Sequence, residues 1–432
     1  MRALLLAGSE SKRMWPLQET CPKPLLSVGG KPIIHWMIEA LAAAGIRDIT
    51  VSIGYRGDQI SEYLGRGADL GVKIDYVVQK EPKGVAESIL VGKEQFQDEK
   101  AFLVANADII ADPEIIRRAQ RHFTDLKSEA VVSLTLTSTP QFYGIAVIDD
   151  QARIRQLVEK PRPEAIQSRY AVAGIYVFRP TIFELLEQTH DLPAALERLI
   201  EAGKPVNGSV WERDWVEISY PWDLIKANQF VLDKVLKGKG CFISEKADIK
   251  QPSRIEGSVY ISDGVVVRPY STIRGPSYVG PNTYIGNNAL IREYTSLGSN
   301  VIVGFGVEIK NSIIGDQTKI GRLCFVGDSV VGRNADIGAG VQLVNYPVAG
   351  ETITSKVLGK VEVVPMKKYG AIVGDSAILS PNVSVYPGVK IGADAVVLPG
   401  TTLSEDVPSH NEAQSPQKVV LRDLSRPREK KT

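Results

Sequence analysis

The 432-residue sequence predicts an α/β domain followed by a parallel β-helix of hexapeptide repeats. Two observations carry this prediction. Over the first third of the chain, apolar strand-like segments alternate with helix-like segments, which is typical of a doubly wound, mostly parallel sheet. From residue 243 an aliphatic side chain stands at every sixth position. That period fits neither an α-helix nor a coiled coil, but it matches the six-residue faces of a triangular coil.

Short apolar runs define the elements of the α/β domain. Residues 3–6 precede a turn-rich loop, which indicates a buried parallel strand. Residues 32–44 are apolar at helical spacing and begin with a proline, as first helical turns often do. Further strands are expected at 48–53, 72–78 and 101–105. Since such sheets bind ligands where their strands end, the candidate site comprises the loops from Ala7, Gln79 and Asn106.

The β-helix prediction covers residues 241–403. The aliphatic series runs without a gap from 243 to 309 and continues, with short slips, to the end of this region. Twelve consecutive matches at 243–309 are negligible by chance. The period is lost between 345 and 368, so a hairpin or other excursion is expected to leave the coils there.

The chain therefore divides into three parts. Residues 1–236 form the α/β domain, and residues 222–236 are expected to be its closing helix. The sequence Lys-Gly-Lys-Gly at 237–240 is a plausible hinge to the solenoid at 241–403. Residues 404–432 are polar and lack a period, so they are expected to form a mobile tail.

Composition argues against several classes of function. The 51 basic and 50 acidic residues give no general electrostatic attraction to nucleic acid or to a membrane surface. Three cysteines and four histidines lack metal-ligand spacing, which indicates a reducing compartment and no structural metal. The apolar start is too short for a secretory signal, and no run approaches transmembrane length. A cytoplasmic protein is therefore expected.

The loop after the first strand carries the strongest chemical signal. Residues 6–17 are rich in small side chains, and a Pro-Lys-Pro sequence follows closely. A loop of this kind can point backbone N–H groups at phosphates. Its two bases, Arg13 and Lys23, could then neutralise a triphosphate. A surface loop with two solvated bases would give the same pattern, so this segment alone does not decide between the two interpretations.

The same segment resembles the signature of the sugar-1-phosphate nucleotidyltransferases, leucine-alanine-glycine-glycine-x-glycine-threonine-arginine followed by proline-lysine-proline. Further segments resemble motifs of that family in the same order, at 79–86, 106–108, 143–144, 159–161, 173–178 and 215–224. With the attached solenoid, the whole chain is similar to the archaeal-type bifunctional enzymes that make UDP-N-acetylglucosamine. The resemblance implies a Rossmann-like nucleotidyltransferase domain and a left-handed β-helix.

The resemblance also implies a reaction. A nucleotidyl group would pass from a nucleoside triphosphate, UTP or dTTP by preference, to a sugar-1-phosphate, and pyrophosphate would leave. Positioning and charge neutralisation would supply most of the catalysis. Arg13 and Lys23 would be catalytic, through the triphosphate and the leaving pyrophosphate. Asp108 and Glu217 would hold Mg²⁺, a hard ion that takes oxygen ligands.

The remaining site residues come from the same resemblance. The nucleotide is assigned to Ala7, Gly8, Gln79 and Gly84. The sugar phosphate is assigned to Gly144, Glu159, Lys160 and Gly174. Taken alone, Glu159 and Lys160 would be an ordinary surface pair, and Gly84 an ordinary turn glycine.

Several positions depart from the family pattern. Ser9 and Ser11 stand where glycine is usual, and a Cβ in a left-handed backbone conformation there would cost about 1–3 kcal/mol. Glu217 replaces the usual aspartate and is one methylene longer. Val172 stands where an asparagine usually contacts the sugar. These changes keep open a second hypothesis, a non-catalytic regulatory or scaffold subunit that binds nucleotide sugars.

The solenoid departs further from its acetylating relatives. In them a histidine acts as general base, but the matching run at 322–328 begins with Arg322, which cannot accept a proton near neutral pH. Three possible second-site ligand contacts still match, namely Arg292, Lys310 and Asn345. We therefore expect an oligomerisation scaffold, giving a trimer or a dimer of trimers. A bifunctional enzyme with intact acetyl transfer is the third hypothesis.

Overall fold

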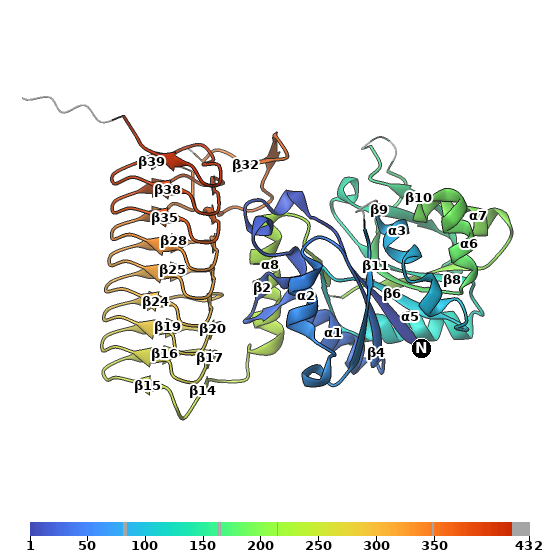
Figure 1. Ribbon diagram of the computed structural model, residues 1–432, viewed down its shortest axis with the longest axis horizontal. Helices are drawn as coiled ribbons and strands as arrows, with labels where there is room; N and C mark the ends of the chain where they lie inside the picture. The colour runs from blue at the N-terminus through green and yellow to red at the C-terminus, as the bar shows by residue number, and fades with distance from the viewer. Residues whose placement is uncertain (81–83, 163, 165, 214, 348–349, 417–432) are drawn as a thin grey trace, which may run out of the picture.

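The computed structural model describes residues 1–80, 84–162, 164, 166–213, 215–347 and 350–416. Two bodies lie side by side in it, an α/β domain and a column of stacked coils (Figure 1). The predicted fold class is confirmed: a Rossmann-like α/β domain is followed by the parallel sheets of a left-handed β-helix. No helix in the described part of the chain is long and apolar enough to cross a membrane.

The α/β domain is built on one mixed sheet, whose parallel half carries the start of the chain. Strands β6, β1, β4 and β5 follow one another in this order, and each neighbouring pair is parallel. Their bounds are β1 Arg2–Ala7, β4 Asp48–Ile53, β5 Lys73–Val78 and β6 Phe102–Asn106. Because these strands point the same way, their carboxyl ends meet at one edge of the sheet.

The other half of the sheet is largely antiparallel, because β11 runs against its neighbours β6, β8 and β9. The bounds are β8 Ala130–Leu136, β9 Gly144–Ile148, β10 Ile154–Glu159, β11 Tyr170–Phe178 and β12 Val206–Trp211. The register between β11 and β8 shifts between Val172 and Tyr176, around Gly174, whose φ is +69°. A Cβ there would lie 2.5 Å from Ile109 Cδ1 and 2.7 Å from Asn106 Nδ2. This irregular part of the strand therefore requires glycine.

Helices cover both faces of the sheet, as in a doubly wound fold. Alternate residues of β1 face opposite sides: Ala3 and Leu5 belong to one buried cluster and Leu4 to another. The first cluster includes α1, α2 and α5, and the second includes α3, α4, α6 and α7. The helices are α1 Ile33–Ala43, α2 Gly57–Leu64, α3 Val85–Leu90, α4 Lys93–Phe96, α5 Pro113–Asp125, α6 Thr181–Thr189, α7 Leu192–Glu201 and α8 Pro221–Val235.

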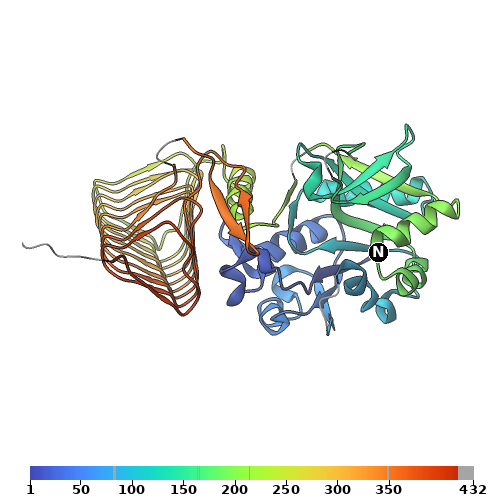
Figure 2. The same ribbon diagram turned by 90° about the horizontal axis from the view of Figure 1, so that it is seen from above.

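The solenoid stacks its coils into three parallel sheets, which form the sides of a triangular column (Figure 2). The first sheet contains β14 Phe242–Ile243, β17 Val259–Ile261, β20 Ser277–Val279, β23 Ser296–Leu297, β26 Ile313–Ile314, β29 Val330–Val331, β34 Ile372–Val373 and β37 Lys390–Ile391. The second contains β15 Asp248–Ile249, β18 Val266–Val267, β21 Tyr284–Ile285, β24 Ile302–Val303, β27 Lys319–Ile320, β30 Asp336–Ile337, β35 Ile378–Leu379, β38 Val396–Val397 and β40 Glu412–Ala413. The third contains β16 Arg254–Glu256, β19 Thr272–Arg274, β22 Leu290–Ile291, β25 Glu308–Lys310, β28 Phe325–Gly327, β31 Gln342–Leu343, β36 Ser384–Val385 and β39 Thr402–Leu403.

The aliphatic residues of the hexad form the core of this column. Ile285, Ile291 and Leu297, one from each sheet, are fully buried in a single cluster. The slip in the series after Ile309 is a shortened corner. Asn311 turns there in the left-handed region, with φ +46°, which asparagine adopts more readily than most residues. The period in the sequence thus reflects the one position in each face that must point inward.

The solenoid departs from the expected outline at two places. Within residues 345–368, where the period is lost, the hairpin of β32 Thr354–Val357 and β33 Lys360–Val363 leaves the coils. At the far end the coils continue beyond residue 403, so the expected start of the tail at 404 is too early. Val407 bridges to Ile391, and β40 pairs with β38. The change of spacing between Leu403 and Val407 hid this last turn. Residues 417–432 of the expected tail lie outside the described residues.

The two bodies are joined by a packed interface as well as by the chain itself. A buried apolar cluster combines residues of the α/β domain, such as Met14 and Trp222, with Tyr369 and Ile372 of the solenoid. Asn228 on α8 donates to the Tyr294 carbonyl oxygen at 2.8 Å and accepts from the Ser296 hydroxyl at 2.7 Å. The segment expected to be a hinge, 237–240, contains two glycines with positive φ. The helix α8, which precedes it, packs against the first sheet of the solenoid.

Candidate active site

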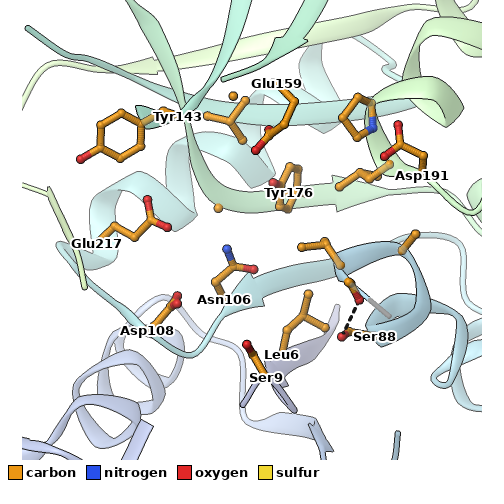
Figure 3. A pocket seen from close by; sticks show the side chains of 18 of the residues that line it. Leu6, Ser9, Ser88, Asn106, Asp108, Tyr143, Glu159, Tyr176, Asp191 and Glu217 are labelled. Carbon is orange, nitrogen blue, oxygen red and sulfur yellow. Dashed lines mark hydrogen bonds between the residues drawn. The ribbon is translucent and has the colours of Figure 1, made fainter. Parts of the chain in front are cut away.

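A cavity of about 600 Å³ opens at the edge where the parallel strands end. Its walls come from the loops after β1, β5 and β6 on one side and from β9, β10 and β11 on the other (Figure 3). Of the residues that the sequence assigned to the site, those that line it are Gly8, Arg13, Lys23, Gln79, Gly84, Asp108, Gly144, Glu159, Lys160, Gly174 and Glu217. Ala7 is buried at the end of β1.

Two carboxylates meet at one end of the cavity. Asp108 directly precedes β7, Ile109–Ala111, and Glu217 ends β13, Trp215–Glu217. These two strands pair antiparallel, with Glu217 opposite Ile109. Figure 3 shows both acids on the same side of the cavity. Burial, and then the charge of Asp108, raises the pKa of Glu217 to about 7. Like charges placed this close favour either a proton or a cation between them.

Lys23 joins this acidic end. Its ammonium group donates to Asp108 Oδ2 and, at 2.8 Å, to the carbonyl oxygen of Ile218. Asp108 Oδ1 is buried and has no hydrogen-bond partner among the described residues. A buried carboxylate oxygen left without a donor is costly, unless a ligand or an ion satisfies it.

The two carboxylates at the acidic end suit a divalent ion whose remaining ligands are waters and substrate oxygens. The described residues contain no group of three or more His, Cys, Asp or Glu side chains able to hold a metal. Two carboxylates are nevertheless a usual protein contribution to a Mg²⁺ site, because this ion keeps waters and takes oxygens from substrate phosphates. The unsatisfied oxygen of Asp108 and the raised pKa of Glu217 fit that use.

A buried amide lies at the opposite end. Gln79 is 4% exposed; its Oε1 accepts from the Ser88 hydroxyl at 2.8 Å, and its Nε2 has no partner among the described residues. A Cβ at Gly8 would lie 2.5 Å from that Oε1, so any larger residue there would require the amide to shift. Gly84 caps α3 with φ +103°. The amide therefore offers N–H donors in a site whose geometry is fixed by its neighbours.

The third wall combines glycines with a charged pair. Gly144 and Glu159 face each other on paired strands, and a Cβ at Gly144 would lie 2.8 Å from Glu159 Oε2. Lys160 has a left-handed backbone, φ +43°, and its ammonium lies 3.5 Å from Glu159 Oε1. Tyr176, on β11, is 7% exposed, and burial raises its pKa.

Of the two serines that replace glycine in the first loop, one has the strained backbone. Ser11 has φ +53°, whereas Ser9 is not in the left-handed region. The Ser11 N–H donates to Ser9 Oγ at 3.3 Å, a bond that glycine at position 9 would lack. One serine thus partly offsets the strain at the other. Two residues further on, the Arg13 guanidinium lies 5.4 Å from the centroid of the Tyr220 ring.

The sequence did not single out several residues that line the cavity. Ser88 carries no motif of its own, Tyr176 lies within the resembling segment 173–178 but was given no role, and His190 and Asp191 lie in the turn between α6 and α7. Packing of α6 and α7 against each other and against the sheet brings that turn to the cavity. Asn106, whose loop the sequence had placed in the candidate site, ends β6 and lines the cavity.

The three residues assigned to a second site lie outside this cavity, on the solenoid. Arg292 is 2.8 Å from Glu308, so its charge is paired. Lys310 and Asn345 both donate to Asp328, which is 4% exposed. Arg292 and Lys310 lie on adjacent coils along the third sheet and Asn345 lies two coils beyond Lys310, and all three are paired with acids.

Comparison with known proteins gives matches over both bodies. Residues 2–234 match the model described as "Nucleotidyl transferase", and residues 273–370 match "GMPPB C-terminal domain". The chain is 34% identical over 428 residues to "Bifunctional protein GlmU" of Methanococcus maripaludis, covering 98% of this chain and 99% of that protein. It is 31% identical over 415 residues to "Bifunctional sugar-1-phosphate nucleotidylyltransferase/acetyltransferase" of Sulfurisphaera tokodaii, with coverage of 94% and 98%.

Proposed function

The chain belongs to the nucleotidyltransferase family, and we propose that it transfers a nucleotidyl group from UTP or dTTP to a sugar-1-phosphate. The observation that supports this most is the acidic end of the cavity. Lys23, Asp108 and Glu217 converge there, and Asp108 keeps one buried oxygen without a partner. A buried carboxylate oxygen without a donor raises the free energy of the empty protein, and a non-catalytic binding subunit would have no need of it.

The proposed reaction requires the enzyme mainly to hold charges in place. A phosphate oxygen of the sugar-1-phosphate forms a bond to the α-phosphorus, and the bond from that phosphorus to the departing pyrophosphate breaks. We propose that Arg13 and Lys23 bind the triphosphate and stabilise the negative charge that develops on the leaving pyrophosphate. Lys160 would hold the sugar phosphate, and Glu159 would accept hydrogen bonds from sugar hydroxyls.

Mg²⁺ is the cation we propose for Asp108 and Glu217. When bound, it would neutralise phosphate charge and so favour attack at phosphorus. The aspartate is held from one side by Lys23, and the Ser219 hydroxyl donates to Glu217 at 3.3 Å, so both carboxylates are oriented before substrate enters.

Gln79 is our proposed reader of the base. Its Oε1 is already used by Ser88, which leaves the Nε2 donor for a ligand. A donor suits a carbonyl oxygen of uracil or thymine. On the sugar side, Val172 lines the cavity and brings no hydrogen-bonding group, so sugar recognition would fall to Glu159 and its neighbours.

A pyrophosphate-release screen tests the proposal. The full-length chain would be incubated with Mg²⁺, each of the common nucleoside triphosphates, and a panel of sugar-1-phosphates. We expect release that requires both substrates and is faster with UTP or dTTP than with ATP or GTP. No release with any pair would favour the binding-subunit hypothesis instead.

We further propose that the solenoid assembles the chain into trimers or dimers of trimers. Large apolar side chains are exposed on the column, among them Ile302, Phe305 and Leu323. Light scattering on the full chain and on a chain ending at Gly238 measures the assembly directly. The shorter chain should be monomeric and less stable, since it also loses one side of the shared apolar cluster. An unchanged oligomeric state would exclude the solenoid as the assembly element.

A further inference from the structure

The loop that carries Arg13 receives only part of its support from its own domain. Residues 8–26 contain no long element, only the short 3-10 turns η1 Lys12–Met14, η2 Leu17–Glu19 and η3 Lys23–Leu25. Around η2, Tyr55 and Gln59 donate to carbonyl oxygens of the loop, at 3.1 and 3.2 Å. These bonds hold one side of the loop.

The late coils of the solenoid hold its other side. The Thr20 hydroxyl donates to Asp375 Oδ2 at 2.9 Å, and Arg333 holds the same carboxylate oxygen at 2.7 Å. The Ser409 hydroxyl donates to one oxygen of Glu19, whose other oxygen accepts from Trp15 Nε1 at 2.9 Å. The last turns of the chain therefore bond directly to the segment just after Arg13.

A buried lysine adds a third tie. Lys390, 3% exposed, lies 4.9 Å from the centroid of the Trp15 ring and 3.6 Å from Asp406. It also donates to the carbonyl oxygen of Lys356 on the hairpin. An ammonium group is expensive to bury unless its partners are in place. Here the partners come from the coils and the hairpin, while the ring belongs to the loop.

An aromatic stack connects Arg13 itself to the solenoid. The guanidinium lies over Tyr220, which stacks on Trp222 with centroids 4.5 Å apart and planes 7° apart. The Trp222 ring in turn meets the Tyr369 ring of the solenoid edge to face, with the ring centroids 6.2 Å apart and the planes at 87°. Tyr369 is fully buried. Figure 2 shows the hairpin that precedes it in the chain reaching from the column to the α/β domain.

We propose that the late coils of the solenoid are a positioning element for nucleotidyl transfer, because they fix the loop and the stack that hold Arg13. This inference rests on the proposed function, in which Arg13 acts on the triphosphate. Asp375 is its central positioning residue: it is not among the residues that line the cavity, but it holds Thr20. A misplacement of about 1 Å at a catalytic group can cost on the order of 100-fold in rate.

The repeat supplies a matched control for Asp375. Asp316 occupies the same corner of an earlier coil and accepts from the Ser299 N–H at 2.7 Å, as Asp375 accepts from the Arg333 N–H at 2.7 Å. In the described structure no hydrogen bond of the Asp316 side chain reaches the α/β domain. Asp375→Ala and Asp316→Ala therefore both remove the corner bond, whereas Asp375→Ala also removes the bonds to Thr20 and to the Arg333 guanidinium and so releases the loop.

The experiment compares these variants in the full-length chain. Pyrophosphate release with saturating substrates should show kcat reduced about tenfold or more in Asp375→Ala and unchanged within about twofold in Asp316→Ala. Thr20→Val keeps the shape of the side chain but loses the hydroxyl donor, so its kcat should fall as in Asp375→Ala. Thr20→Ser keeps the hydroxyl and should retain the kcat of the unmutated chain. The double variant should be no slower than Asp375→Ala, which already lacks the bond that Thr20→Val removes.

Hydrogen–deuterium exchange of residues 9–20 provides a readout independent of turnover. Exchange should rise in Asp375→Ala and Thr20→Val but not in Asp316→Ala, at equal melting temperatures. Equal kcat for the two alanine variants, or unchanged exchange in the loop, would overturn the inference. If the unmutated chain releases no pyrophosphate, the proposed function fails, while the exchange data still decide whether the coils hold the loop.

Discussion

An aspartate with a buried carboxylate oxygen stands beside a lysine in each half of the molecule, and the two carboxylates differ in how their hydrogen bonds are satisfied. In the α/β domain, Lys23 uses Asp108 Oδ2 and leaves Oδ1 without a partner among the described residues. In the solenoid, Asp328 is bonded through both oxygens: Oδ1 accepts from Asn311 at 2.6 Å, and Oδ2 accepts from Asn345 and Lys310.

The contrast separates a carboxylate that is available to a ligand from one that holds the fold. A buried oxygen without a donor raises the free energy of the empty protein, and a cation or a substrate would lower it. A carboxylate with every oxygen occupied gains nothing from a ligand and loses bonds if one displaces its neighbours. Both sites resemble ligand sites in sequence, but on this criterion only the first is prepared for one.

Asp108→Asn should produce the largest change. We expect nucleotidyl transfer to fall on the order of 100-fold or more, because the neutral amide cannot supply the negative charge that would hold Mg²⁺. The melting temperature should stay within a few degrees, since asparagine has nearly the same shape. Pyrophosphate release by folded protein measures the effect. Activity above about a tenth of the unmutated chain would place the metal elsewhere.

The second comparison concerns acetyl transfer. We expect no thiol release from acetyl-CoA with glucosamine-1-phosphate or galactosamine-1-phosphate, because a positioned base typically supplies about 10²–10⁴-fold and Arg322 cannot be one. Arg322→His tests whether the base alone was lost. Release by the mutant only would mean that the pocket survives, whereas robust release by the unmutated chain would restore the bifunctional hypothesis.

Asp328→Ala should affect stability but not transfer. Removing the acid leaves the Asn311 and Asn345 amides without an acceptor and Lys310 without its counter-charge, at a cost of about 1–3 kcal/mol. Denaturant unfolding measures this free energy, and pyrophosphate release should remain within about twofold. A larger loss of transfer than of stability would mean that this cluster communicates with the first site.

Glu217→Asp should change transfer far less than Asp108→Asn. Aspartate is usual in the resembled motif, and one methylene decides how the carboxylate meets an ion with strict geometry. We expect kcat to change by less than about tenfold, in either direction, with the Mg²⁺ dependence retained. If transfer is abolished, the strand that carries Glu217 is adapted to the longer side chain, and its assignment from the motif must be revised.

The sequence predicted those parts of the molecule whose constraints repeat or are local. The inward position of every hexad must be aliphatic, so Ile285 or Leu297 could be placed in the core without a structure. The strand ends at Gln79 and Asp108 followed from short apolar runs, and the resemblance supplied their assigned roles.

Contacts between distant segments could not be predicted in this way. Nothing around His190 or Asp191 shows that their turn lines the cavity, because helix packing alone brings it there. The last coil was missed because the spacing shortens before Val407. The corner at Asp375 has the same sequence pattern as that at Asp316, a glycine followed by aspartate, yet only Asp375 meets Thr20.

The bond between Ser409 and Glu19 joins residues that are 390 positions apart. A chain is synthesised from its N-terminus at about 5–20 residues per second, so the second partner appears on the order of 20–80 s after the first. During that time the α/β domain can fold with its first loop held on one side only. We therefore expect nascent chains to become fully active only after residue 409 has left the ribosome.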